Sequence, residues 1–177
     1  MIKAEYAEER GTMMFKVEQY SGEKSEKYSL VCKQLKALIS DEPNLIANLS
    51  NASALLNTFL DDINWVGFYL YDGKELVLGP FQGLPACIRI PLGKGVCGSA
   101  AKQHEVLRIE DVHQFPGHIA CDAASQSEIV LPIVKEGILI GVLDIDSPSK
   151  NRFDEEDEKG LKQFVDIIVH NIQNTKG

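Results

Sequence analysis

NWVGFYLYDGKELVLG, residues 64–79, is the stretch that decides the expected fold of this chain. Aromatic, valine and leucine residues dominate positions 65–71, and a second apolar run covers 75–79. Asp72-Gly73 stands between them and is a strong hairpin signal, because glycine accepts the positive φ angle that a tight turn requires. The stretch therefore predicts two antiparallel strands joined by a short turn.

A second hairpin is expected further along the chain. One apolar run covers 128–134, a turn follows at 135–137, and a second run covers 138–145. Between the two hairpins we expect a strand at 87–90, a helix starting after Gly95, and a short strand near 106–109.

Helices are expected on both sides of these strands. Apolar residues recur at helical spacing from Tyr28, and a second such pattern begins near Asn44. The acidic run 154–157 suits the N-terminus of a closing helix. Two hairpins with helices before, between and after them predict an α+β fold, in which helices cover an antiparallel sheet.

The length of 177 residues suits one domain with a sizeable core. We expect residues 1–22, which show no sustained periodicity, to be an N-terminal extension that is partly disordered, and residues 23–177 to form the domain. The Met13-Met14 pair makes Met14 a candidate start.

Composition narrows the class of partner. No apolar run approaches the roughly 18 residues of a membrane span, and the charged start is unlike a signal peptide. We therefore expect a cytoplasmic protein without a membrane partner. The net charge of −8, without a Lys/Arg cluster, argues against nucleic acid and favours small-molecule ligands.

The chain has four cysteines, at 32, 87, 97 and 121. A reducing compartment makes a permanent disulfide framework improbable and leaves metal binding, redox chemistry and core packing. Cys32 lies within the first expected helix, where a buried, inert thiol is the favoured interpretation.

The run 93–98, GKGVCG, matches G-x-G-x-x-G, but a dinucleotide site is rejected. A Rossmann unit needs a βαβ crossover and an acidic residue about 20 positions onward, and neither is evident. The preferred interpretation is a tight turn into a helix with Cys97 in its first turn, where backbone N–H groups could lower a thiol pKa.

A zinc site is also disfavoured, so we expect no metal and no cofactor. The candidate donors Cys87, Cys97, His113, His118 and Cys121 contain no pair at the short C-x2–4-C spacing and fall on several elements. Loop hydrogen bonding by the two histidines and a functional role for them both stay open.

Cys121 sits in a segment of small and polar residues, with His118 three positions before it and Asp122 beside it. The setting suits an accessible thiol, but catalysis and an idle thiol both stay open because thiolate character cannot be read from sequence. If Cys121 attacked an oxidised substrate, Cys87 and Cys97 would both be candidates to resolve the sulfenic acid as a disulfide.

Three carboxylates are expected near one pocket. Asp144 and Asp146 are two apart on a strand and so face the same side, while Glu128 begins the preceding strand. Such acids suit a ligand with an ammonium group, although turn formation before Pro148 also explains Asp146. Trp65 and Tyr69 share a strand face and serve either as a pocket wall or as core packing.

With these residues laid out, the chain resembles the free methionine-(R)-sulfoxide reductases, stand-alone enzymes of the GAF fold. The resemblance covers about half of the chain, has no departure at the motif positions, and includes a three-cysteine set that generic GAF domains lack. The matching runs are NWVGFYLY (64–71), LVLGPFQGLPACIRIPLGKGVCGSAA (76–101), DVHQFPGHIACDAASQSEIVLPI (111–133) and GVLDIDSP (141–148).

The resemblance implies a GAF-like antiparallel sheet of about six strands and gives roles to the cysteines. Cys121 matches the thiol that attacks the sulfoxide sulfur and becomes a sulfenic acid, and Cys87 matches the thiol that resolves it as a disulfide. Cys97 matches a third family cysteine, either a nucleophile or an alternative resolving thiol. Thioredoxin is the implied reductant.

The resemblance also implies the substrate contacts. Glu128, Asp144 and Asp146 match carboxylates that hold the free amino acid and donate a proton to the sulfoxide oxygen, with Trp65 and Tyr69 near the methyl group. By analogy with GAF domains that pair through terminal helices, a homodimer is expected. The alternative function is a non-catalytic GAF module that binds a small molecule and regulates a partner.

Overall fold

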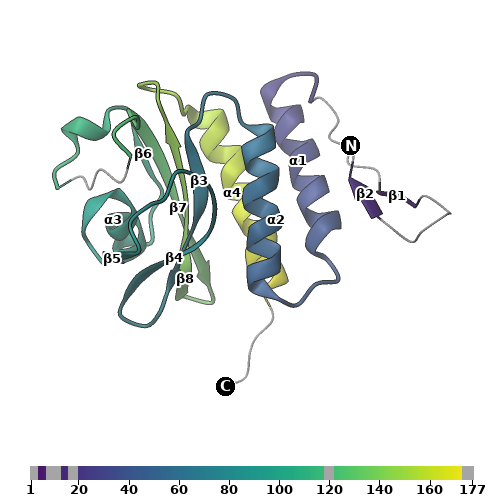
Figure 1. Cartoon of the computed structure of the whole chain (residues 1–177), viewed down its shortest axis with the longest axis horizontal. Coiled ribbons are helices and arrows are strands. Elements are labelled where there is room, and N and C mark those ends of the chain that lie inside the picture. Colours follow the sequence, from purple (N-terminus) through teal and green to yellow (C-terminus); the bar gives the residue numbers. More distant parts are fainter. Residues whose placement is uncertain (1–3, 7–12, 16–19, 118–121, 173–177) are drawn as a thin grey trace.

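The computed structural model describes residues 4–6, 13–15, 20–117 and 122–172. Its main sheet has six antiparallel strands in the order β5-β4-β3-β8-β7-β6 (Figure 1), and the α+β prediction is confirmed. The strands are β3 (Trp65–Tyr71), β4 (Glu75–Gly83), β5 (Arg89–Pro91), β6 (Leu107–Ile109), β7 (Ser127–Lys135) and β8 (Ile138–Ser147).

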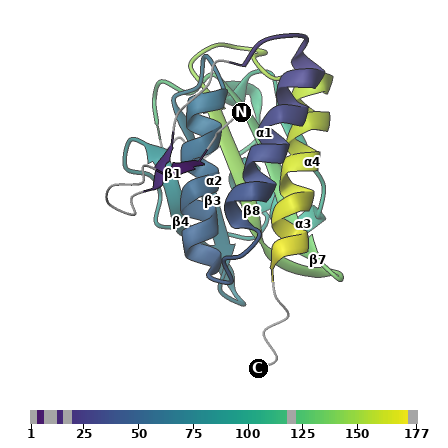
Figure 2. The ribbon, with the colours of Figure 1, turned by 90° about the vertical axis from the view of Figure 1, so that its right-hand side faces the viewer.

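Helices cover both faces of this sheet. Helices α1 (Lys24–Ile39), α2 (Leu45–Phe59) and α4 (Glu155–Asn171) form a layer on one face, and the short α3 (Gly95–Gln103) lies on the other (Figures 1 and 2). The sheet therefore has one face for the main core and one face that a small helix and loops leave partly open.

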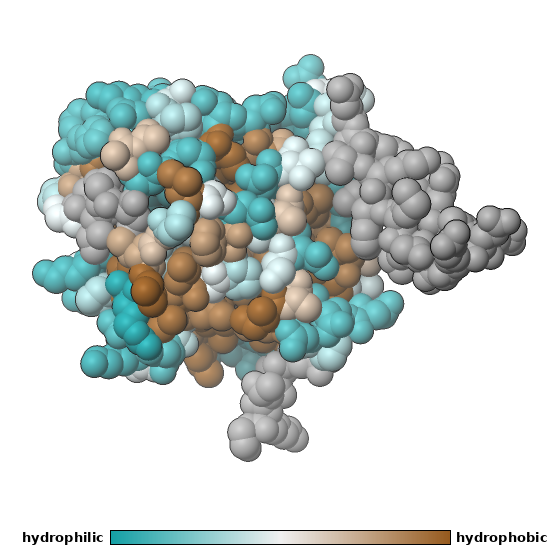
Figure 3. Space-filling view, in the orientation of Figure 1, coloured by the Kyte–Doolittle hydropathy of each residue, from teal (hydrophilic) through white to brown (hydrophobic). Residues whose placement is uncertain are grey.

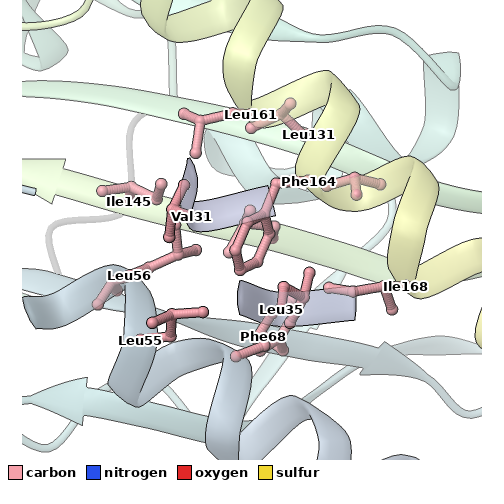
Figure 4. Packing of buried hydrophobic residues seen from close by; sticks show 14 of the residues in the cluster. Val31, Leu35, Leu55, Leu56, Phe68, Leu131, Ile145, Leu161, Phe164 and Ile168 are labelled. Carbon is pink, nitrogen blue, oxygen red and sulfur yellow. The ribbon is translucent and has the colours of Figure 1, made fainter. Parts of the chain in front are cut away.

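Alternation along β3 distributes side chains between the two faces. Val66 and Phe68 join the main core beneath α1, α2 and α4 (Figure 4), whereas Trp65 and Tyr69 join a second cluster beside α3. This separation follows from the two-residue period of a strand. It turns the odd-numbered positions of β3 toward the second face.

Both expected hairpins are present. Gly73 has a φ of 95°, and the Asp72 side chain accepts hydrogen bonds from the backbone N–H groups of Lys74 and Glu75. The second turn is one residue shorter than expected, because β7 extends to Lys135. Glu136 and Gly137, with φ angles of 52° and 81°, form a two-residue turn of the kind that suits strand twist.

Side chains at the helix starts explain where two helices begin. The Asn44 side chain accepts a hydrogen bond from the Ala47 N–H at the start of α2. Asp154 and Asp157 form a capping box that opens α4. These caps satisfy backbone donors that have no partner within the helix, so both starts fall where the sequence predicts them.

Smaller differences concern the segment before α3 and the N-terminus. The strand expected at 87–90 begins only at Arg89, so Cys87 lies in the connection before β5. Two short strands, β1 (Ala4–Tyr6) and β2 (Met13–Phe15), pair within residues 1–22. The division into an extension and a domain at residue 23 stays a prediction.

Cys32 is buried on α1 with its thiol toward the carbonyl oxygen of Gly160, as expected for a packing residue. Among the described helices, none is both long enough and apolar enough to cross a membrane.

Candidate functional site

Three acidic side chains lie on the α3-facing side of the sheet. In the strand register, Asp146 stands opposite Trp65 on one side and Glu128 on the other, and Asp144 stands opposite Gly67. Glu128 and Asp144 are each only 6% exposed. The sheet therefore brings Glu128 together with two acids that lie 16 and 18 positions further along the sequence.

These acids form the floor of a pocket that the candidate residues share. Strands β3, β7 and β8, the first turn of α3 and the connection before β5 all contribute to its lining. The lining residues are Trp65, Tyr69, Leu84, Pro85, Ala86, Ile90, Lys94, Gly95, Val96, Cys97, Asp122, Ser125, Glu128, Asp144 and Asp146.

Stacked aromatic rings form one wall. The Trp65 ring lies 5.9 Å from that of Tyr69 and 5.3 Å from that of Phe81, centroid to centroid, and its indole N–H donates to the carbonyl oxygen of Leu84. Trp65 and Tyr69 thus pack in a core cluster and also line the pocket. Both interpretations left open by the sequence therefore apply to these residues.

Gly67 makes room for this stack. A Cβ atom at Gly67 would lie 2.7 Å from the Trp65 ring and 2.3 Å from the Phe81 Cβ atom, both closer than side chains tolerate. The absence of a side chain at this position lets the indole lie over the strand toward Tyr69.

Cys97 lies in the first turn of α3 and points at the acids. Its Sγ donates to Glu128 Oε1 at 3.8 Å. Burial raises the pKa of Cys97, and the charges of Asp144 and Glu128 raise it further. The expectation that the helix start lowers this pKa is therefore wrong, because burial and negative neighbours favour the neutral thiol.

The pKa values of the three acids are raised as well. Burial raises the pKa of Asp144 to about 6. The pKa values of Glu128 and Asp146 are raised well above normal, first by burial and then by the negative charge of Asp144. Close carboxylates cannot all ionise cheaply, so Glu128 and Asp146 favour their protonated forms, whereas Asp144, with a pKa of about 6, carries the negative charge at neutral pH.

Cys97, Glu128 and Asp144 place one potential ligand atom each within 4.8 Å of one another. This donor set differs from the one considered in the sequence and is the right size for a metal ion. A metal requires deprotonated ligands, however, and all three pKa values are raised. The geometry permits a cation, but the protonation states oppose it.

The structure gives a partial view of the other two cysteines. Cys87 is half-buried and disulfide-bonded, whereas Cys32 and Cys97 carry free thiols. Cys121 and His118 lie outside the described residues. Ala86, which precedes Cys87 in the sequence, and Asp122, which follows Cys121, both line the pocket. A residue next to each of these two cysteines therefore belongs to the pocket.

Asn64 is a residue whose role the sequence did not reveal. Its side-chain N–H group donates to Asp122 Oδ2 at 2.8 Å and to Ser125 Oγ at 3.1 Å, and its backbone N–H donates to the carbonyl of Asp146. Asn64 thus ties the segment after Cys121 to the sheet. Its only sequence signal is a polar residue directly before an apolar strand.

His113 lies in a short 3-10 helix, η1 (Val112–Gln114), and does not line the pocket. Its backbone N–H is held by the Asp111 side chain. The structure therefore does not bring His113 together with Cys87 and Cys97, the donors with which the zinc hypothesis grouped it.

Comparison with known proteins agrees with this fold. The model of the GAF domain family matches residues 44–172. A free methionine-R-sulfoxide reductase of Escherichia coli is 58% identical over 142 residues, which are 80% of this chain and 86% of that protein. One of Saccharomyces cerevisiae is 44% identical over 141 residues, 75% of this chain and 78% of that protein.

A solved structure also resembles this one, in both fold and sequence. It is the free methionine-R-sulfoxide reductase of Neisseria meningitidis in complex with its substrate, with a TM-score of 0.85, 41% identity and coverage of 89% of this chain and 95% of that one. The sequence resemblance is thereby confirmed: the chain belongs to the free methionine-R-sulfoxide reductases, a family of oxidoreductases built on the GAF domain.

Proposed function

We propose that this protein reduces free L-methionine-(R)-sulfoxide to L-methionine through a cysteine sulfenic acid and an intramolecular disulfide. One observation carries the proposal: three carboxylates with raised pKa values lie at the floor of a pocket with an aromatic wall, beside the segment that contains Cys87. The names of the relatives supply the substrate.

The pocket suits a free amino acid at both of its charged ends. Asp144 Oδ1 is buried and has no hydrogen-bond partner among the described residues, and it would accept a bond from the substrate ammonium. Lys94 and the first backbone N–H groups of α3 line the same pocket and would meet the substrate carboxylate. A peptide-bound methionine sulfoxide lacks both charges.

The first chemical step needs an acid. The Cys121 thiol attacks the sulfoxide sulfur, and the oxygen passes to the cysteine as a sulfenic acid while methionine leaves. Protonation of the sulfoxide oxygen makes this transfer feasible. Glu128 and Asp146 have raised pKa values, first because of burial, and this favours the protonated state that such a donor requires.

The second step forms a disulfide. The Cys87 thiol attacks the Cys121 sulfenic acid, the S–S bond forms, and water leaves. A dithiol such as thioredoxin then supplies two electrons and two protons, returning both cysteines to thiols. The net reaction converts the sulfoxide and a dithiol to methionine, a disulfide and water. The disulfide at Cys87 supports this assignment.

Cys97 fits a different part of this scheme. Its thiol is buried, neutral and hydrogen-bonded to Glu128, so it is a poor nucleophile as it stands. We propose that Cys97 holds the Glu128 carboxyl group in place. A resolving role for Cys97 is the alternative, which the peptide mapping below tests.

The test is turnover of free L-methionine-(R)-sulfoxide with dithiothreitol as reductant. Cys121→Ser removes activity, by at least about a thousandfold, because it removes the proposed nucleophile, and Cys97 in the pocket lining is buried with a raised pKa. Cys32→Ser leaves activity unchanged and is the matched control, because Cys32 is buried in the main core.

Peptide mapping after one turnover without reductant identifies the linked cysteines. We expect Cys87 joined to Cys121. Full activity of Cys121→Ser, or a disulfide that contains Cys97, would overturn this assignment and make Cys97 a redox residue.

A further inference from the structure

We propose that Leu84, Pro85 and Ile88 form a docking surface for the protein dithiol that reduces the Cys87 disulfide. We call these three residues the Cys87 surface. The inference rests on the proposed function and adds the place on the molecule where the electrons enter.

The Cys87 surface exposes large hydrophobic side chains next to a disulfide. Leu84 is 62% exposed and Ile88 is 70% exposed. Among the described residues only two other large hydrophobic side chains are exposed, Ile46 at the start of α2 and Ile138 at the β7–β8 turn, and they lie on separate elements. Single exposed apolar residues are common, but two within five positions around a redox cysteine call for an explanation.

The backbone holds these side chains outward. The indole N–H of Trp65 donates to the carbonyl of Leu84, and the backbone N–H of Leu78 donates to the carbonyl of Ile88 at 2.9 Å. Pro85 restricts the chain between these two points. Exposure of Leu84 and Ile88 is therefore a property of an ordered segment.

The cation next to this surface is already paired. Arg89 bonds to Asp72 and Glu75, each at 2.9 Å. A partner at this point meets apolar side chains and a paired cation, which favours hydrophobic docking over the binding of an anion. Figure 3, in the orientation of Figure 1, shows hydrophobic residues gathered over the middle of that face of the molecule, so apolar side chains are not confined to the interior.

Cys87 is accessible enough to react there, since its side chain is only half-buried. A thiolate must approach the disulfide sulfur directly, and a protein donor can do so only when it is docked against the surrounding surface. Transient redox partners use small interfaces, so a few apolar side chains suffice.

The electron transfer balances as two exchanges. The donor's first thiolate attacks Cys87 Sγ, forming a mixed disulfide and releasing the other enzyme cysteine as a thiolate. The donor's second thiol then attacks the sulfur of the donor's first cysteine in the mixed disulfide. A disulfide forms within the donor, and Cys87 is released as a thiolate. Two electrons pass from the donor dithiol to the enzyme disulfide.

The experiment compares Ile88→Ser with the wild type using two reductants, a bacterial thioredoxin and dithiothreitol. We expect the KM for thioredoxin to rise about tenfold in Ile88→Ser, as for loss of one buried aliphatic contact. Turnover with dithiothreitol stays unchanged, because this small molecule needs no docking surface and Ile88 does not line the pocket.

Two further variants and a trap complete the design. Ile138 is a similarly exposed isoleucine at the β7–β8 turn, and Ile138→Ser should keep the wild-type KM for thioredoxin. Ile88→Leu, which keeps an apolar side chain at position 88, should also keep the wild-type KM. A thioredoxin with its second active-site cysteine replaced by serine should form a mixed disulfide at Cys87, located by peptide mass mapping.

The outcomes separate the two proposals. An unchanged thioredoxin KM in Ile88→Ser, or an equal rise in Ile138→Ser, overturns the docking surface. Absence of turnover by the wild type with dithiothreitol overturns the proposed function instead.

Discussion

Asp144 is buried in the middle of β8, and its Oδ1 atom has no hydrogen-bond partner among the described residues. A group in this position is costly in the empty protein and useful when a cation arrives. The same burial that raises its pKa to about 6 therefore prepares it for an ammonium group.

This burial predicts a pH effect on stability. Folded Asp144 keeps its proton up to about pH 6, whereas the unfolded chain loses it near its ordinary pKa of 3.8. The folded state thus binds more protons between these values, and the free energy of unfolding falls as pH rises through this window. The contribution amounts to about 3 kcal/mol.

Urea unfolding between pH 4 and 6.5 checks this expectation by comparing the wild type with Asp144→Asn. The variant should lose less stability over this range, though some slope remains because Glu128 and Asp146 are shifted in the same direction. Equal slopes for the two proteins would contradict the assignment.

At the scale of elements, the contact between α1 and α4 depends on a glycine. A Cβ atom at Gly160 would lie 2.2 Å from Cγ of the Tyr28 ring. The ring cannot easily move aside, because the Tyr28 hydroxyl donates to Asp157 Oδ1 at 2.7 Å. Asp157 also bonds to Lys24 and Arg152, so several contacts hold the two helices in register.

Gly160→Ala is therefore expected to destabilise the protein. Overpacking costs about 1–3 kcal/mol, against a gain of roughly 1 kcal/mol in helix propensity, so we expect a net loss of about 1 kcal/mol in urea unfolding. Lys159→Ala, at the exposed neighbouring position, should change stability by less than about 0.5 kcal/mol. A Gly160→Ala variant as stable as the wild type would show that α4 can shift.

For the whole molecule, the pocket joins β3, β7, β8 and α3, so ligand binding should stabilise the folded state as a unit. L-Methionine at a hundredfold excess over its dissociation constant should add about 2.7 kcal/mol to the unfolding free energy. For a chain of this length the midpoint of thermal unfolding should rise by about 5 to 10 °C.

N-acetyl-L-methionine is the matched control in this thermal experiment. It keeps the side chain and the carboxylate but lacks the ammonium group that the acids would hold. We expect no rise with the acetylated compound. An equal rise with both would contradict the proposed role of the carboxylate floor. The expected homodimer and the physiological reductant also belong to this scale and stay predictions.

Much of the fold could be predicted because its signals are local. Asp72-Gly73 and Glu136-Gly137 mark turns through the φ angles that glycine accepts, and Asn44 and Asp154 begin helices by capping free N–H groups. Each signal acts within a few residues. The helices and strands of the main sheet were therefore predicted well, with differences of a few residues at strand ends, whereas the short β1, β2 and η1 were not predicted.

For the site, the residue types and the shared face of Asp144 and Asp146 could likewise be read from the sequence, because strand side chains alternate. The state of Cys97 could not. Its neighbour Glu128 is 31 positions away, and only the packing of α3 on β7 and β8 creates the burial that raises both pKa values.

The stretch 64–79 thus determined by itself a hairpin and the direction in which Trp65 and Tyr69 point. The tertiary structure decided what those rings face, because β8 places Asp146 opposite Trp65 and Asp144 opposite Gly67, which leaves space for the Trp65 ring. It also decided that Asn64 holds the segment after Cys121, through hydrogen bonds to Asp122 and Ser125. Alternation and turn geometry are properties of neighbours in the chain, whereas desolvation and charge repulsion depend on neighbours in space.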